Sequence, residues 1–204
     1  MPNIFKFSNA GGFKTLTRYP DMLAGNTVWN PYSPTGAYDA LATVSVGSGG
    51  ASSITFSGIP NTYTHLEIRG IGRSVNAIGG IGLRMQFNGD TGSNYAAHGI
   101  YGDGSTPTAY NSVSTTALPV GELVGTSGTA NVFGASIITI LDYASIVKNK
   151  TVRTLEGIDL NGSGYIEFDS GFWINQTSKI NSIYLYTTNG NFAQYSSYSL
   201  YGVR

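Results

Sequence analysis

The 204-residue chain contains no cysteine, so it can form neither a disulfide framework nor a thiolate metal site. Charged residues are also scarce, at 11% of the chain, against about 25% in an average soluble protein. The 11 basic and 11 acidic residues give a formal net charge of zero, so the basic surface typical of nucleic-acid-binding proteins is missing. A surface with so few charges is weakly protected against association, which favours a subunit of an assembly.

Long apolar runs are missing as well. No segment approaches the roughly 20 consecutive apolar residues of a membrane-spanning helix, and residues 1–12 lack the apolar core of a signal peptide. We therefore expect no membrane span, and folding in a cytoplasm such as that of a bacterial host.

The chain also lacks recognised catalytic patterns. His65 and His98 have no ligand-spaced partner, and neither HExxH nor GxSxG occurs. Glu156, Glu167 and Asp169 are the carboxylates available for glycosidic-bond cleavage, and Glu167 and Asp169 share a strand face. We interpret these carboxylates as a solvated face. The sequence thus predicts no enzymatic activity and no cofactor.

Two segments carry oxygen ligands that a cation could use. The segment DLNGSGYIE, which begins at Asp159, matches the start of an EF-hand calcium loop, but Ser170 stands where a bidentate carboxylate is needed. Asp90, Asn94 and Asp103 could form a second oxygen-rich cluster at one end of the predicted sheet. A β-hairpin turn explains the first segment and ordinary turn chemistry the second, so we predict no metal site.

What the chain has in abundance is short alternating segments separated by turns. Residues 83–88 show the pattern most clearly, with Leu83, Met85 and Phe87 on one dry face, and the next residues, NGD, break the strand. In residues 164–174, Ile166 and Phe168 lie on one face. Residues 106–128 are polar and resemble a long excursion, a kind of segment that is often functional. We count roughly nine or ten strands and no convincing amphipathic helix, which predicts an all-β, jelly-roll-like antiparallel β-sandwich over residues 41–204.

Residues 1–40 differ from the rest of the chain. Alternation is weak there, and the segment holds four of the seven prolines together with many large apolar side chains. We predict an extended N-terminal arm that anchors the protein to a partner or a sister subunit; a strap folded over its own domain is the alternative. The expected anchoring residues are Phe5, Phe7, Phe13, Trp29 and Tyr32.

The 14 tyrosines supply many flat, amphipathic surfaces. Tyrosine favours interfaces with one apolar and one wet side, which suits burial between subunits. Tyrosine rings also stack on sugars. For this second use, Tyr95, Tyr101 and Asp103 are the candidate glycan-binding residues.

Three segments, SSITFSGIPNTYTHLEIRG, LRMQFNGDTGSNYAAHGIYGDGS and NFAQYSSYSLYGVR, together resemble a group of tailed-bacteriophage virion proteins, especially from phages of cyanobacteria and other environmental bacteria. The likeness covers about residues 43–203, with Arg69, Arg84–Tyr95 and Asn191–Gly202 in matching positions, and it leaves the arm outside. It implies a jelly-roll-like module of a head decoration, cement, fibre or tail component, often trimeric. No catalytic residue carries over from it.

Two hypotheses follow from these observations. In the first, the chain is a structural virion protein, assembled in the host cytoplasm, whose β domain forms a homotrimer and whose arm attaches to capsid or tail proteins. In the second, it is a receptor-binding module that recognises a host surface glycan. Fold alone does not separate them, because jelly rolls serve both purposes.

Overall fold

The computed structural model describes residues 14–16, 27–29 and 37–204. The chain divides into two compact units, Met1–Asp39 and Ala40–Arg204. In the first unit, β1 (Lys14–Leu16) and β2 (Thr27–Trp29) pair in parallel.

The predicted anchoring role of the arm stays a prediction. Phe5, Phe7, Phe13 and Tyr32 lie outside the described residues, and of Trp29 only the backbone is described.

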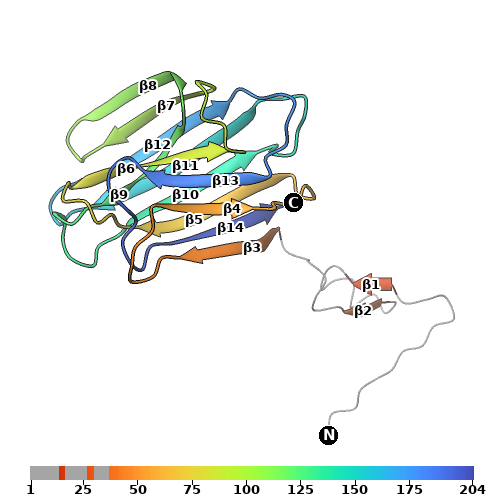
Figure 1. The fold of residues 1–204 in the computed structure, drawn as a ribbon, viewed down its shortest axis with the longest axis horizontal. Coiled ribbons are helices and arrows are strands. Elements are labelled where there is room, and N and C mark those ends of the chain that lie inside the picture. The colour runs from red at the N-terminus through yellow and green to blue at the C-terminus, as the bar shows by residue number, and fades with distance from the viewer. Residues whose placement is uncertain (1–13, 17–26, 30–36) are drawn as a thin grey trace, which may run out of the picture. The chain divides into compact units, whose positions relative to one another are not determined.

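The second unit is a sandwich of two antiparallel sheets (Figure 1). The larger sheet has eight strands, in the spatial order β3 (Tyr38–Ser45), β14 (Ser197–Val203), β5 (His65–Gly72), β10 (Gly134–Leu141), β11 (Lys150–Asp159), β12 (Gly164–Trp173), β7 (Tyr95–Gly102) and β8 (Pro107–Thr115). The smaller sheet has four, in the order β4 (Ser53–Ser57), β13 (Ser182–Thr187), β6 (Gly80–Phe87) and β9 (Leu118–Val124). The described residues contain no helix, so the predicted all-β sandwich is confirmed.

The order of the strands is that of a jelly roll with additions. If the hairpins β7–β8 and β11–β12 are set aside, the eight remaining strands lie in the order 1-8-3-6 in the larger sheet and 2-7-4-5 in the smaller one. This interleaving is the double Greek key of a jelly roll. The two hairpins extend the larger sheet beyond β10.

The core fills the space between the sheets. Leu83, Met85 and Phe87 on β6 are all buried, which confirms the predicted dry face of that strand. They meet inward side chains of the larger sheet such as Leu66 and Ile138. Burying each such side chain stabilises the fold by about 1.5–3 kcal/mol.

The NGD turn after β6 connects the two sheets. Asn88 and Gly89 adopt positive φ angles of 53° and 71°, which short polar residues and glycine tolerate. Asp90 then accepts a hydrogen bond from Trp173 Nε1 at 2.7 Å, and the Tyr95 hydroxyl donates to the Asp90 carbonyl at 2.9 Å. This turn therefore has a structural role, because it ties β6 of one sheet to β7 and β12 of the other.

The division of the chain at residue 39 falls inside β3, and Leu41 and Val44 of that strand pack on the core. One segment differs from the sequence interpretation. The predicted excursion over residues 106–128 is wrong, because it consists largely of β8 and β9. β8 shows no alternation of apolar and polar residues, because this edge strand is exposed along most of its length.

Candidate functional site

A groove lies where the larger sheet projects past the smaller one. β9 is the edge strand of the smaller sheet and packs over β10, β11 and β12. The larger sheet continues beyond it with β7 and β8 (Figure 1). A cavity of about 580 Å³ follows the edge of β9, and its chemically notable lining residues are Arg84, Tyr101, Tyr110, Glu122, Glu156, Tyr165, Glu167 and Tyr186.

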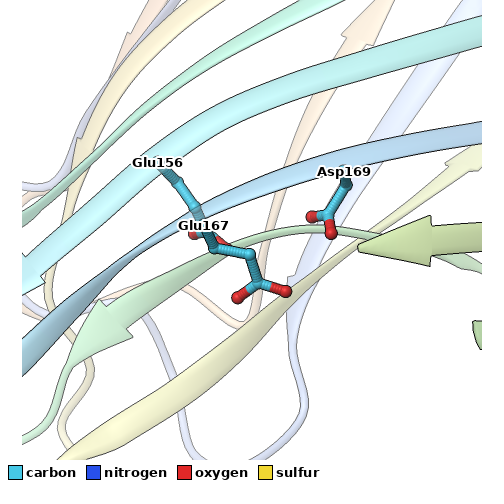
Figure 2. Close-up of side chains that lie close together, drawn as sticks. All are labelled: Glu156, Glu167 and Asp169. Atoms are coloured by element: carbon cyan, nitrogen blue, oxygen red, sulfur yellow. The ribbon is translucent and has the colours of Figure 1, made fainter. Parts of the chain in front are cut away.

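Three carboxyl groups gather at this groove, where Glu156 and Glu167 line the cavity and Asp169 lies beside them. Glu156 on β11 lies directly opposite Glu167 on β12 in the strand register, and Asp169 follows on the same face of β12. One carboxylate oxygen from each residue lies within 4.8 Å of the others. Figure 2 shows the three side chains reaching from the two neighbouring strands toward the same region.

The predicted solvated face for these carboxylates is wrong. Glu156, Glu167 and Asp169 are only 4%, 8% and 6% exposed. The reason is that the extension reverses the usual polarity of a sandwich strand. Acidic residues of β11 and β12 face inward, whereas Ile166 and Phe168, which do share one face as predicted, point outward and are each about half exposed.

Hydrogen bonds hold two of the carboxyl groups in place. The Glu122 backbone N–H, on the free edge of β9, donates to the Glu156 carboxyl and so joins the two sheets. Asp169 accepts from the Tyr110 hydroxyl at 2.6 Å and from Thr154 Oγ1 at 3.0 Å. These donors satisfy acceptors whose burial would otherwise cost about 1–3 kcal/mol each.

Glycine makes the Tyr110 contact possible. Gly99 on β7 lies between β8 and β12, opposite both Tyr110 and Asp169. A side chain at Gly99 would collide with the Tyr110 ring and with the Asp169 carboxylate. The Tyr110 side chain therefore crosses β7 through the space that the glycine leaves.

Burial controls the protonation of the cluster. Burial, and then the hydrogen bond to Glu167, raise the pKa of Glu156 well above its ordinary value of 4.5. Burial, and then the charge of Asp169, also raise the pKa of Glu167. Two carboxyl groups this close cannot both ionise cheaply, so the Glu156–Glu167 pair shares a proton at neutral pH.

Tyrosines form the walls of the groove. The rings of Tyr101 and Tyr165 lie 5.7 Å apart at 55°, and both side chains are half-buried. Burial, together with neighbouring carboxylates, raises the pKa of the Tyr110 and Tyr165 phenols, so both remain hydrogen-bond donors. Arg84 and Tyr186 complete the lining from the smaller sheet.

The three predicted glycan-binding residues occupy different places. Tyr101 lines the groove. Asp103 is exposed on the turn after β7, where its carboxylate accepts bonds from Ser105 and Thr106. Tyr95 is fully buried in the core and cannot reach a ligand at the surface. Tyr110, Tyr165 and Glu122 were missed, because nothing in the local sequence shows that β8, β9 and β12 meet.

The candidate cation clusters are explained by turns. The predicted β-hairpin turn at Asp159 is confirmed, since β11 and β12 pair across it and the Asp159 carboxylate accepts a hydrogen bond from the Asn161 N–H. Asp90 and Asn94 are hydrogen-bonded to each other. Asp103 lies at the opposite end of β7, so the three do not form one cluster.

The carboxyl cluster is the better arrangement for a cation, because its three oxygens lie close enough to bind one ion. Without a metal, a proton shared by Glu156 and Glu167 removes one negative charge, and the hydroxyl donors to Asp169 stabilise another. The two histidines lie elsewhere: His65 accepts a bond from the Asp142 N–H, and His98 is exposed on the outer face of β7.

Comparison with models of protein families, with curated proteins and with solved structures finds no match to this chain. Among the residues that the structure describes, none forms a helix with the length and apolar character that a membrane crossing needs.

Proposed function

We propose that this chain is a glycan-binding protein and that the groove beside β9 holds an uncharged, hydroxyl-rich saccharide. The observation that carries the proposal is the pairing of tyrosine walls with a base of hydrogen-bonding carboxyl groups. Aromatic rings stack on the apolar faces of sugar rings, and carboxylates accept hydrogen bonds from their hydroxyls. The volume of about 580 Å³ lies in the usual range for small-ligand sites.

The charge of the groove narrows the ligand class. The lining contributes three glutamates and one arginine, Arg84. This excess of acidic side chains repels phosphate-rich ligands such as nucleic acid, so the groove favours neutral sugars. An apolar ligand would also displace water from Glu122 and Arg84 in the lining without offering them hydrogen bonds.

Binding without cleavage is the expected mode. In glycoside hydrolases the two catalytic carboxyl groups flank the scissile bond, about 5–5.5 Å or 6.5–9.5 Å apart. Here Glu156 and Glu167 interact with each other, and Glu156 is also tied to the backbone of β9. A sugar ring has no place between them.

A glycan array with the full chain tests the proposal. We expect binding to selected neutral glycans, weakened about tenfold or more by Tyr101→Ala, because the loss of a stacking ring removes about 1.4 kcal/mol. Glu167→Gln should weaken binding by a similar factor. Thr55→Ala, on the exposed face of β4, is the matched control and should leave binding unchanged. Binding that survives both groove substitutions would exclude the groove as the site.

We infer that the protein acts as part of a tailed-phage particle, as a decoration, cement or head-fibre protein that forms a homotrimer; a tail fibre is the alternative position. The sequence resemblance supports this, as does an outer sheet face with exposed apolar side chains such as Phe168. In this role Phe5, Phe7, Phe13, Trp29 and Tyr32 of the arm attach to a capsid or tail protein.

Co-sedimentation with capsids stripped of this protein, combined with light scattering, tests this role. The full chain should be trimeric and should bind the capsids. A variant with Phe5, Phe7 and Phe13 replaced by serine should remain trimeric and lose capsid binding. Equal binding by the two proteins would contradict anchoring through the arm, and a full chain that ignores both capsids and tails would contradict the virion role.

A further inference from the structure

The outer face of the larger sheet carries a strip of exposed apolar side chains. We define the apolar strip as Ile71, Ile100, Ile137, Leu155, Ile166 and Phe168, which come from the five strands β5, β10, β11, β12 and β7. Each of these side chains is between 40% and 57% exposed. Single exposed apolar residues are ordinary, but a contiguous patch indicates an interaction surface.

The strand register shows that the strip is continuous. Ile137, Leu155, Phe168 and Ile100 are cross-strand partners of one another in a single unbroken row across β10, β11, β12 and β7. Ile71 and Ile166 belong to the adjacent row, with Ala135 and Gly157 between them. Because these two small residues lie between larger ones, the strip has a shallow hollow bordered by Ile71, Ile137, Leu155 and Ile166.

The strip carries almost no charge, and this limits the kind of partner that can bind to it. Arg69 is the charged residue within these two rows of the described sheet, and it already bonds to Glu67 at 2.7 Å. A partner recognised by opposite charge would find little to bind here. An identical uncharged face, in contrast, meets no repulsion.

Size and shape also suit a copy of the same chain. Half-exposed faces of six large apolar side chains amount to several hundred Å², the size of the largest patches on ordinary monomers. The next row holds Thr139, Arg153, Ser170 and His98, which would form a polar rim. An apolar centre with a polar rim, totalling about 800 Å² per partner, is the usual composition of a stable interface.

We propose that neighbouring copies of this chain cover the apolar strip, so that the strips of the three subunits face one another around the axis of the homotrimer. The inference rests on the proposed self-association and names the surface that produces it. It does not depend on glycan binding, because the groove opens on the opposite face of the same strands.

The first experiment measures association of the full chain by light scattering over a concentration series. Phe168→Lys should weaken association at least tenfold, because it places an unpaired charge in the centre of the strip. Thr55→Lys, on the outer face of the smaller sheet, is the control and should associate like the natural chain. Far-UV circular dichroism of both variants verifies that they are folded.

The second experiment leaves the strip nearly intact. Since the chain has no cysteine, Leu155→Cys and Thr55→Cys each introduce a single thiol. Maleimide should label Leu155→Cys at least tenfold more slowly at concentrations where the oligomer forms than after dilution to the monomer. It should label Thr55→Cys at the same rate at both concentrations.

The outcomes separate the two proposals. A monomeric natural chain overturns self-association and, with it, the present inference. An oligomer that persists with Phe168→Lys and labels rapidly at Leu155→Cys overturns only the inference about the strip. Slow labelling of Leu155→Cys in a monomer would indicate that residues 1–36 of the same chain cover the strip. That result would also overturn the inference.

Discussion

Glu156 is an acidic residue that the fold removes from water. Its carboxyl is buried, adjoins Glu167 and accepts a hydrogen bond from the edge of β9. Its pKa is raised by burial and by Glu167, so the native state keeps a proton that the unfolded chain releases near pH 4.5. The native state thus binds more protons over the interval between the two pKa values, and the free energy of unfolding falls as pH rises through that interval.

We therefore predict that urea unfolding shows decreasing stability from pH 5 to pH 8, and that Glu156→Gln removes much of this slope. Glutamine needs no proton and can still accept the bond from Glu122 while donating to Glu167. At pH 8 the free energy of unfolding of the variant should be higher than that of the natural chain by on the order of 1–3 kcal/mol. Asp159→Asn, at the exposed end of the same strand, should keep the slope. An unchanged slope in Glu156→Gln would show that this carboxyl ionises normally.

The same residues show what alternation can and cannot predict. The spacing of Ile166 and Phe168, and of Glu167 and Asp169, correctly assigns each pair to one face of a strand. It does not say which face meets the core, and the ordinary preference for apolar residues inside gives the wrong answer here. The decision depends on β9, which ends above β12 and encloses acidic side chains rather than apolar ones.

At the scale of elements, β7 controls the groove through its glycines. Gly99 leaves the space in which Tyr110 reaches Asp169, whereas Gly102, further along the same strand, has no atom near the position of a side chain. We predict that Gly99→Ala lowers the free energy of unfolding by about 1–3 kcal/mol, since Tyr110 must move and Asp169 loses a donor.

Gly102→Ala is the matched control, since it tests the change of backbone entropy without the collision. It should leave stability within about 0.5 kcal/mol of the natural chain. Thermal and urea unfolding measure both variants. Equal effects of the two substitutions would mean that Tyr110 finds another route to Asp169.

Elements also differ in how visible they are in the sequence. β6 and β10 alternate clearly because one face of each lies on the core. β8 shows no such contrast, because it is an exposed edge strand. A sequence pattern reports burial on one side, so the strand that borders the groove was the hardest to predict.

For the whole molecule, connectivity predicts a single unfolding unit. The chain passes from one sheet to the other at β3–β4, β4–β5, β5–β6 and β6–β7, so neither sheet can separate with the other intact. Trp173 reports on this directly, because it is buried and contacts Phe87 of the smaller sheet and Tyr95 of the larger.

The chain has two tryptophans, so Trp29→Phe leaves Trp173 as the single tryptophan, which can be excited selectively over the tyrosines. We predict that its fluorescence and the far-UV circular dichroism of the variant change together along a urea titration, as in a two-state transition. A fluorescence change that precedes the loss of sheet would indicate that the two sheets separate first.

The sequence was sufficient for the class of fold, since alternation, turns and the absence of helical patterns all indicate a sandwich. The groove was beyond its reach, because Glu156, Tyr110 and Glu122 meet only through long-range pairing of strands. Tyr101, predicted from the chemistry of tyrosine alone, does line the groove, and its role in binding stays a prediction.

The pairing of β3 with β14 also has a mechanical consequence. Hydrogen bonds join Thr43 to Ser199 and Ser45 to Ser197, so the start of β3 adjoins the end of β14 and the C-terminus. Tension between residue 37 and the C-terminus would peel this ladder apart one rung at a time, at low force. Tension between residue 37 and a ligand held in the groove would instead shear all its rungs together. A molecule attached through its arm and pulled at its groove is thus stressed along its strong direction, whereas a cargo fused to the C-terminus would pull along the weak one.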